Sequence, residues 1–350
     1  MPPSLIPAEQ GLLPAVADRL SSGYLVALPT ETVYGLAADA ENPSAVRAVF
    51  AAKGRPADHP LIVHLADATQ ATRYVQSWPL PAQLLAARFW PGPLTMVLPA
   101  SPAVLLEVTG GQSTVALRVP DHPFTRAVIK ALGRGIVAPS ANRFGRISPT
   151  TAAHVVDEFP NETLWVVDGG TTPVGVESTI VDLSRLDSAG LVILRPGAIG
   201  AAEIAAALAA GGAAYPVVGA PGGASAATPR VPGALAAHYA PVTPLLLWQE
   251  PDYRRWLDEA GRTADAVPTH AVWFPRHWPA ASNETVRIDQ PTEPTILAQQ
   301  LYAVLRALDA SGAAELWVAL PEGEGALLAA VRDRLSRAAH RELALIGSVS

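Results

Sequence analysis

Hydrogen-bonding side chains cluster directly after the apolar run at residues 24–28. Residues 30–34 read Thr-Glu-Thr-Val-Tyr, so four of these five side chains can form hydrogen bonds. Pro29 cannot donate to a sheet ladder, and Gly35 permits an unusual backbone turn. Open α/β sheets place ligands at polar loops that follow buried strands. A polar turn between two core segments explains these residues equally well.

Lys53 and Arg55 form a pair of cations at the end of a predicted helix. Asn42 and Pro43 make a favourable helix start, and Gly54 can end the helix. Lys53 continues the apolar stripe of that helix, so its charge either reaches the surface on an apolar stem or points into a site. The pair indicates an anion site, although a helix C-terminus also favours positive charge.

Residues 113–119 predict a strand with two different faces. Three apolar side chains point to one face, and Thr114, Ala116 and Arg118 point to the other. A hydroxyl, a small residue and a guanidinium could together hold a carboxylate or a phosphate. The alternative is that this face is solvated.

Other polar side chains stand at or near the ends of apolar runs. Ser140 follows the run 135–139, Ser148 lies a short distance beyond it, and Arg195 ends the run that starts at Leu191. His64 interrupts a further apolar run, where a histidine is more often a hydrogen-bonded core residue than a ligand.

The common nucleotide and hydrolase motifs are absent from the sequence. The chain has no Gly-x-x-x-x-Gly-Lys-Ser/Thr, Gly-x-Gly-x-x-Gly, His-Glu-x-x-His or Gly-x-Ser-x-Gly. It has no cysteine, which excludes disulfides, thiolate zinc sites and a cysteine nucleophile. An ATP site would therefore be assembled from separate residues. The candidates are Lys53, Arg55, Thr114, Arg118, Ser140, Ser148 and Arg195.

The composition indicates an acidic globular protein of two domains. The 350 residues, 49% of them hydrophobic, are enough for two cores. No apolar run reaches the ~20 residues of a membrane helix, and no secretory signal is visible. The net charge of −6 restricts any RNA contact to a weak, local one. The lack of cysteine fits a reducing cytoplasm, where we expect the protein.

Helical and strand patterns alternate along the chain, which predicts an α/β protein. Residues 1–210 predict a twisted open α/β sheet domain. Residues 211–243 are rich in Gly, Pro, Ala and Ser and predict a linker. Residues 244–350 predict a smaller, Rossmann-like α/β domain with mostly parallel strands. The helices expected in the first domain span about 8–22, 43–53, 81–90, 122–132 and 200–210.

Eight short motifs follow one another in an order typical of one protein family. They are Pro-Thr-Glu-Thr-Val-Tyr-Gly-Leu at 29–36, Lys-Gly-Arg-Pro at 53–56, His-Pro-Leu-Ile-Val-His at 59–64, Trp-Pro-Gly-Pro-Leu-Thr at 90–95, Arg-Val-Pro at 118–120, Pro-Ser-Ala-Asn at 139–142, Glu-Ser-Thr-Ile at 177–180 and Arg-Pro-Gly at 195–197. With His-Tyr-Ala-Pro at 238–241, the chain resembles the YrdC/Sua5 family of threonylcarbamoyl-AMP synthases, in its two-domain Sua5 form.

The resemblance implies a reaction and its partners. Family members convert L-threonine, bicarbonate and ATP into threonylcarbamoyl-adenylate and pyrophosphate. The adenylate then passes to the machinery that builds N6-threonylcarbamoyladenosine at position 37 of tRNA. Mg²⁺ is expected to arrive with the triphosphate, so we expect no metal site made by the protein alone.

The resemblance also implies roles for individual residues. Lys53 and Arg55 are the candidates for catalysis. The implied threonine contacts are Thr32, His64, Arg118, Ala138 and Ser178. The implied nucleotide contacts are Arg55, His59, Thr114, Ser140, Ser148, Arg195 and Tyr239.

Two positions of the family pattern lead to further expectations. His59 stands where many members have asparagine, which would make that nucleotide contact pH-dependent. Tyr239 lies in the predicted linker, so we expect residues 211–243 to fold back over the site of the first domain as a lid.

Two other functions are compatible with parts of the sequence. One is a carbamoyl-adenylate-forming module like that of hydrogenase maturation proteins, but the chain has no cysteine for the zinc-finger-like regions found there. The other is a double-stranded RNA-binding module without catalysis, which the net negative charge disfavours.

Overall fold

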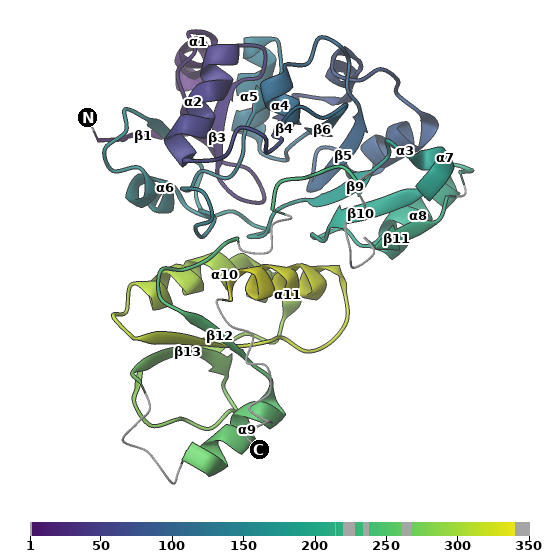
Figure 1. Cartoon of the computed structure of the whole chain (residues 1–350). Helices are drawn as coiled ribbons and strands as arrows, with labels where there is room; N and C mark the ends of the chain where they lie inside the picture. Colours follow the sequence, from purple (N-terminus) through teal and green to yellow (C-terminus); the bar gives the residue numbers. More distant parts are fainter. Residues whose placement is uncertain (1, 214, 220–227, 234–237, 261–267, 340–350) are drawn as a thin grey trace. The chain divides into compact units, whose positions relative to one another are not determined.

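Figure 1 shows the computed structural model of the chain, which describes residues 2–213, 215–219, 228–233, 238–260 and 268–339. Helices and strands alternate along it, which confirms the predicted α/β fold class. None of the described helices is both long enough and apolar enough to span a bilayer.

The chain divides into two compact units. The first unit comprises residues 1–144 and 148–234, and the second comprises residues 145–147 and 235–350. The short segment after Phe144 therefore belongs with the C-terminal part of the chain.

The first unit is built on one mixed sheet of eleven strands. The strands are β1 (Ser4–Pro7), β2 (Val26–Leu28), β3 (Gly35–Asp39), β4 (Ile62–His64), β5 (Leu94–Pro99), β6 (Thr114–Arg118), β7 (Ile136–Val137), β8 (Trp165–Asp168), β9 (Thr179–Asp182), β10 (Leu191–Arg195) and β11 (Val217–Gly219). Their order across the sheet is β1-β8-β2-β3-β7-β4-β6-β5-β9-β10-β11.

Five helices of the first unit lie close to their predicted positions, whereas the short helices Leu106–Thr109, Ala152–Glu158 and Leu186–Ala189 are not predicted from the sequence. The helices of this unit are α1 (Leu13–Ser21), α2 (Pro43–Lys53), α3 (Leu80–Phe89), α4 (Leu106–Thr109), α5 (Pro123–Leu132), α6 (Ala152–Glu158), α7 (Leu186–Ala189) and α8 (Ala201–Ala210), with 3₁₀ turns at Gln10–Leu12 and Ala68–Arg73. The first helix starts later than predicted. The Ala8 N–H donates to the Asp168 carbonyl at 3.1 Å, which continues the β1–β8 ladder.

Both ends of α2 form as the sequence predicts. The Asn42 side chain accepts hydrogen bonds from the N–H groups of Ser44 and Ala45 at 3.0 and 3.2 Å. Gly54 ends the helix in the left-handed conformation, at φ 64°, which glycine adopts without strain. Lys53 is therefore the last helical residue, and it lies on the buried side.

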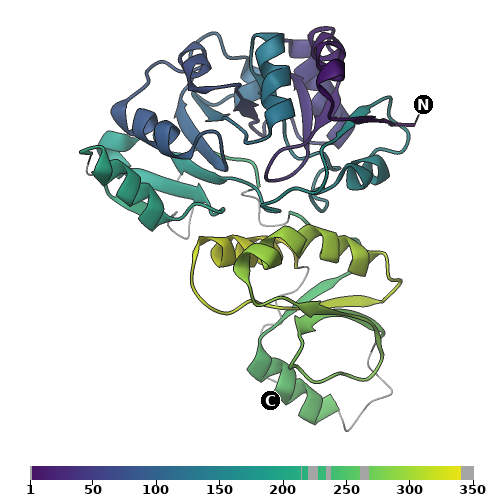
Figure 2. The same ribbon diagram turned by 180° about the vertical axis from the view of Figure 1, so that it is seen from behind.

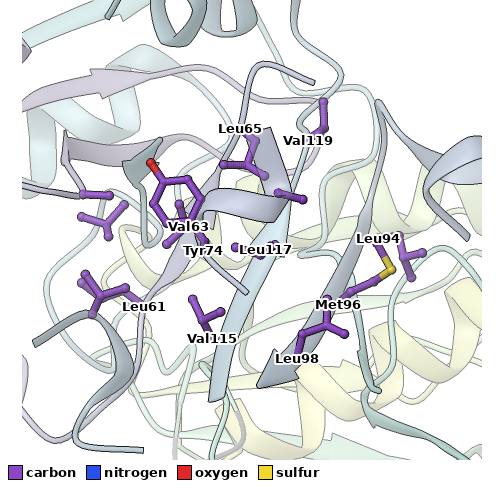
Figure 3. Close-up of a cluster of buried hydrophobic side chains, with 14 of the residues drawn as sticks. Leu61, Val63, Leu65, Tyr74, Leu94, Met96, Leu98, Val115, Leu117 and Val119 are labelled. Carbon is purple, nitrogen blue, oxygen red and sulfur yellow. The ribbon is translucent and has the colours of Figure 1, made fainter. Parts of the chain in front are cut away.

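Strands β4, β5 and β6 separate an apolar face from a second face. Figure 3 shows the apolar cluster, which includes Leu61, Val63, Leu65, Leu94, Met96, Leu98, Val115, Leu117 and Val119. The alternate residues of β6 lie on the second face, as predicted. Ala116 and Arg118 are only 6% and 4% exposed, so this second face is not a solvated one.

Helices α1 and α5 cover part of this second face. Figures 1 and 2 show the two helices side by side, and their apolar residues pack with Ile136 of β7. His64 of β4 is the register partner of Ile136, so both side chains lie on this face. The candidate site residues therefore lie next to the helix-covered area.

Three strands occur where the sequence pattern predicts none. β1 pairs with β8, β3 follows the polar loop at 29–34 directly, and β11 lies in the predicted linker and pairs with β10. β3 reads Gly-Leu-Ala-Ala-Asp and β11 reads Val-Val-Gly, which are too short or too poor in branched residues for recognition. These segments become strands because their backbones form hydrogen bonds with neighbouring strands of the sheet.

The second unit contains a four-stranded sheet in which every pair is parallel, as predicted. The strands β12 (Leu245–Trp248), β13 (His270–Pro275), β14 (Glu284–Gln290) and β15 (Glu315–Ala319) have the order β12-β15-β13-β14. The helices are α9 (Glu250–Ala260), α10 (Pro294–Asp309) and α11 (Ala326–Ala338). Figure 1 shows α10 and α11 on one side of this sheet and α9 on the other.

Candidate active site

The Arg118 guanidinium is the centre of a buried cluster at the end of β6. Its Nη2 lies 2.8 Å from Glu31 Oε1 and donates to Thr32 Oγ1 at 2.9 Å, and its Nε donates to the Gly92 carbonyl at 3.3 Å. The Asp121 N–H donates to the other Glu31 oxygen at 3.0 Å. The Arg118 and Glu31 side chains are 5% and 6% exposed, so the ion pair is shielded from water. The carboxylate thus fixes the guanidinium.

The Nη1 group of Arg118 makes no hydrogen bond to the described part of the chain. It is therefore available to an anion. A guanidinium with one edge fixed and another edge available can bind a carboxylate in a defined orientation.

His64 stands beside Arg118 in the register of β4 and β6. Its Nδ1 lies 3.2 Å from the Ile62 carbonyl oxygen, which can only accept, so Nδ1 carries the proton and Nε2 is an acceptor. Burial, followed by the charge of Arg118, lowers the pKa of His64 to about 3. The imidazole is therefore neutral at physiological pH.

A local turn aims Thr32 at Arg118. Thr30 Oγ1 accepts hydrogen bonds from the N–H groups of Thr32 and Val33 at 3.1 and 3.2 Å, and it donates to the Val33 carbonyl at 2.6 Å. Threonine hydroxyls stabilise turns in this way. Thr30 Oγ1 also lies 2.9 Å from Thr32 Oγ1, so the two hydroxyls are joined next to the guanidinium.

Arg195, at the end of β10, forms a second cluster with Ser178. Its Nε and Nη2 donate to the Ser178 carbonyl at 3.1 and 3.0 Å, and Nη2 also donates to Ser178 Oγ at 3.1 Å. Thr95 Oγ1 lies 2.8 Å from the same hydroxyl. The structure therefore places a predicted threonine contact directly against a predicted nucleotide contact.

The turn at Gly92–Pro93 connects the two clusters. The Gly92 carbonyl accepts from Arg118, and the Pro93 carbonyl accepts from the Thr179 N–H at 2.9 Å. A Cβ on Gly92 would lie 2.4 Å from the Phe89 carbonyl oxygen, so only glycine fits this turn.

Lys53 is tied to the loop that follows β7. Its Nζ donates to the carbonyl oxygens of Ser140 and Asn142 at 2.6 and 2.5 Å. Burial, followed by the nearby charge of Arg55, lowers the pKa of Lys53 well below its ordinary value. The side chain thus holds the backbone of the predicted nucleotide loop in place.

Phe144 brings Arg55 and His59 together. The His59 ring meets the Phe144 ring edge-on at a centroid distance of 5.4 Å, and Arg55 Cζ lies 5.9 Å from the same ring. Arg55 Nη2 also donates to the Pro60 carbonyl at 3.0 Å. Partial burial, followed by the charge of Arg55, lowers the pKa of His59, so its charged form is confined to acidic solution.

Three other predicted contacts take simpler positions in the first unit. Ser148 Oγ donates to Glu177 Oε1 at 2.7 Å, and both side chains are buried. Ala138 lies against Gly35, where an added Cβ would approach the Ala138 Cβ to 3.0 Å. Thr114 is half-buried at the start of β6.

Tyr239 belongs to the second unit. Its ring stacks on Tyr302 at 5.8 Å, and Arg334 Cζ lies 5.4 Å from the ring centroid. Its backbone is left-handed, at φ 63°, which is uncommon for tyrosine. Its contact with a nucleotide stays a prediction.

Residues 228–233 of the predicted linker, here called the strap, lie on the first unit. Val231 packs in an apolar patch with Ile62 and Ala116 on the site face of the sheet. The Arg230 N–H donates to Gln112 Oε1 at 2.7 Å, and Gln112 Nε2 donates back to the Arg230 carbonyl at 3.1 Å. The strap also reaches the second cluster, because the Pro232 carbonyl accepts from Arg195 Nη1 at 2.9 Å.

The site face has two polar ends with a small apolar middle. Thr114 and Arg118 lie on the same face of β6, four residues apart, so their Cα atoms are about 13 Å apart. Ala116 lies between them, under Val231. An elongated ligand with an anionic group towards each end would match this arrangement.

Both parts of the chain match known protein families. Residues 18–197 match the Sua5/YciO/YrdC family, described as "Telomere recombination", and residues 199–340 match "Threonylcarbamoyl-AMP synthase, C-terminal domain". The threonylcarbamoyl-AMP synthase of Pyrococcus abyssi is 37% identical over 347 residues, which cover 94% of each chain. The chain belongs to the YrdC/Sua5 family.

Further Sua5 relatives support this assignment. The threonylcarbamoyl-AMP synthase of Bacillus subtilis is 45% identical over 232 residues, covering 66% of this chain and 65% of the relative. The crystal structure of P. abyssi Sua5 complexed with L-threonine aligns with a TM-score of 0.84 at 35% identity, covering 95% of this chain and 96% of that one. This structural match confirms the YrdC-like and Sua5 architecture expected from the sequence.

Several site residues were not assigned from the sequence. Glu31 lies inside the polar loop and Thr95 inside the Trp-Pro-Gly-Pro-Leu-Thr motif, so both had a signal. Glu177 likewise begins the Glu-Ser-Thr-Ile motif. Phe144 and Gln112 had no signal, because each acts through a partner more than 25 residues distant. In the described part of the chain, no three carboxylate or imidazole side chains converge as metal ligands.

Proposed function

We propose that the site on the first unit is that of an L-threonylcarbamoyladenylate synthase, a nucleotidyltransferase. It would form threonylcarbamoyl-AMP and pyrophosphate from L-threonine, bicarbonate and ATP. The observation that carries the proposal is the set of buried cations in the first unit, with Arg118 beside a neutral His64 and with Lys53 bound to the Ser140 loop. Family membership supports it.

The Arg118 end suits threonine. Its Nη1 would bind the threonine carboxylate, while the acceptor Nε2 of His64 and the hydroxyls of Thr32 and Ser178 would meet the amine and the hydroxyl. Ala138 would form an apolar wall. Because His64 is neutral, its Nε2 can accept a hydrogen bond from the ligand without adding a second positive charge.

The reaction needs positioning and charge stabilisation more than a nucleophile from the protein. The threonine amine forms a C–N bond with the carbon of bicarbonate, and water is lost. A carbamate oxygen then attacks the α-phosphorus, and pyrophosphate leaves with the electron pair of the broken P–O bond. Lys53, Arg55 and Arg195 would stabilise the negative charge that develops.

ATP would enter as its magnesium complex, with Mg²⁺ held mainly by the phosphates. His59, Thr114, Ser140 and Ser148 would supply the remaining nucleotide contacts of the first unit, and Tyr239 would supply one from the second unit. The adenylate would then pass to the cytoplasmic tRNA threonylcarbamoyl-transfer machinery for position 37. Any direct RNA contact would be weak and local, given the net charge of −6.

We also propose the domain roles 1–210 for catalysis, 211–243 for a linker and lid, and 244–350 for the Sua5 extension. The contacts of the strap support the proposed lid, because Gln112 and Arg195 both form hydrogen bonds with the strap backbone. A closed lid would exclude water from a labile carbamate and adenylate. Slower proteolysis within residues 211–243 when ATP and threonine are present would support closure, and equal rates would reduce the segment to a tether.

The test of the reaction is direct. Purified protein is incubated with ATP, bicarbonate and labelled threonine, and the products are examined for an acid-labile threonine adduct of AMP and for pyrophosphate. Threonine should be preferred over serine, valine and alanine. Valine and alanine would leave the polar groups that bind the hydroxyl without a partner, and serine lacks the methyl group that would pack against the apolar wall. Equal pyrophosphate release with valine and with threonine would contradict the proposal.

A further inference from the structure

The second unit contains a cavity of about 200 Å³ at the carboxyl edge of its parallel sheet. Three strands contribute to it where they end: β13 with Pro275, β14 with Gln290 and β15 with the following Leu320. In open parallel sheets this edge is where ligands bind. The described residues that line the cavity all lie between 250 and 328, in the second unit.

The walls of the cavity are mainly apolar. Leu297 of α10 and Leu328 of α11 face it, together with Trp278 and Pro291 from the loops. Pockets for drug-sized ligands measure roughly 300–1,000 Å³, so this cavity suits a smaller molecule than a nucleotide.

Gln290 places a buried polar group at the cavity. The residue is 7% exposed, and its Nε2 donates to the Ala319 carbonyl at 2.8 Å. This bond reaches from β14 to β15 past the end of β13, because β13 lies between them in the sheet. Oε1 accepts no hydrogen bond from the described residues. It is thus an acceptor that the cavity can offer to a ligand.

The charge of the lining is negative. Among the residues that the structure describes, Glu250 and Glu322 line the cavity, and no lysine or arginine does. Glu250 is held by Arg254, with Oε1 accepting from Nη2 at 2.6 Å, and His277 Nε2 lies 3.6 Å from Oε2. Glu322 is exposed and has no ion-pair partner among the described residues. Arg332 Nη1 donates to the carbonyl oxygens of Pro321 and Gly323, both at 2.9 Å, so this guanidinium binds the backbone beside Glu322. The side chains of the lining itself keep a net negative charge, which favours a cation.

The nearby helix ends do not reverse this preference. The Glu293 carboxylate accepts from the N–H groups of Thr295 and Ile296 at 3.1 and 2.8 Å, so the start of α10 is already matched with negative charge. The start of α11 has no side-chain cap, but Glu322 and Glu324 precede it in the same loop. A phosphate would meet these carboxylates.

We propose that this cavity binds a small molecule that carries a primary amine on a short apolar body. The ammonium group lies between the Glu322 carboxylate and Gln290 Oε1, and the apolar body lies along Leu297 and Leu328. The positive charge of this ligand distinguishes it from ATP and bicarbonate, which are anions, and from threonine, which also carries a carboxylate. The cavity does not depend on the proposed synthase reaction.

Calorimetry on the full-length protein tests the proposal with n-butylammonium as the probe. We expect saturable binding with one site per chain, and binding of 1-butanol and butyrate weaker by about tenfold or more, since they lack the charge-assisted hydrogen bonds. AMP and inorganic phosphate should not displace the probe. No saturable binding, equal binding of 1-butanol, or displacement by phosphate would overturn the proposal.

Two variants locate the binding. Glu322→Gln should weaken n-butylammonium by about tenfold, the loss of one charge-assisted contact. Glu324→Gln is the matched control, because it lies in the same loop and does not line the cavity. Thr292→Trp places bulk at an exposed position of the rim and should abolish binding while the melting temperature stays unchanged. Equal affinities of the Glu322 and Glu324 variants, or full affinity of the Thr292 variant, would refute the site.

Discussion

The two units place opposite charges at their candidate binding regions. The first contains four buried cations, Lys53, Arg55, Arg118 and Arg195, each less than a tenth exposed. The second has two glutamates, and no lysine or arginine, among the described residues that line its cavity. Both regions are built on α/β sheets, so the sheet alone does not select the ligand. The residues at the strand ends and in the loops do.

The two regions also differ in how their charges are held. In the first unit, buried cations are fixed by backbone carbonyls and by the shielded Glu31 carboxylate. In the second, Glu322 is exposed to solvent. Interactions between charges that are buried away from water are stronger and less sensitive to salt. Mutations in the first unit should therefore have larger effects, and each prediction below tests this difference.

The largest effect is expected for Arg118→Ala. Removal of the guanidinium that would bind the threonine carboxylate should lower kcat/KM for threonine by at least about 100-fold. Truncating one member of a buried charge pair removes a strong contact and leaves Glu31 unpaired. Steady-state kinetics with varied threonine, and separately with varied ATP, checks this. n-Butylammonium binding should be unchanged.

A surface arginine and a double variant serve as controls for Arg118. Arg47→Ala removes an exposed guanidinium paired with Glu107 and should leave kcat/KM unchanged. Glu31→Gln combined with Arg118→Ala should restore melting temperature without restoring threonine use. If threonine affinity survives Arg118→Ala while ATP affinity collapses, the two ends of the site have been assigned the wrong way round.

The second effect concerns acid stability. Burial lowers the pKa of His64 from 6.5 to about 3, so the unfolded chain binds a proton in this range and the folded chain does not. The free energy of unfolding therefore decreases as the pH falls from 6.5 towards 3, and His64 contributes up to about 1.4 kcal/mol of this decrease per pH unit.

Replacement of His64 by asparagine isolates this contribution, since the amide can still donate to the Ile62 carbonyl. Denaturant melts between pH 7 and 4 should show a smaller loss of stability for His64→Asn than for the native protein. Parallel slopes in the two proteins would mean that His64 is charged in the folded state.

A third, intermediate effect is expected for Glu31→Gln. The change keeps the shape of the side chain but removes the charge that orients Arg118, so KM for threonine should rise about tenfold while KM for ATP stays constant. Glu107→Gln, at an exposed pair, is the matched control. A rise in both KM values would indicate a general structural role for Glu31.

The smallest effect is expected for His59. Its lowered pKa keeps it neutral at pH 7–8, and below its ordinary range protonation adds attraction for phosphate, so KM for ATP should fall as the solution becomes acidic. His59→Asn should remove this dependence, with a change of about threefold or less at pH 7. A pH profile identical in both proteins would exclude His59 as its source.

Much of the first site could be predicted because its signals are local. The alternation along residues 113–119 separated Arg118 from the core, and Asn42, Pro43 and Gly54 marked the ends of α2. Such patterns depend on covalent geometry and on neighbours within a few residues. The family motifs extended this local reading to the reaction and to the residues proposed for it.

Only the tertiary structure decided which of these side chains meet. It paired Arg118 with Glu31, set Arg195 on Ser178, and seated Val231 of the predicted linker on Ala116. It also made strands of Gly35–Asp39 and Val217–Gly219, and it formed the acidic cavity from loops far apart in the chain. Sequence periodicity specifies which face of an element is apolar, whereas contacts between distant segments depend on strand order and register, which arise only when the whole sheet assembles.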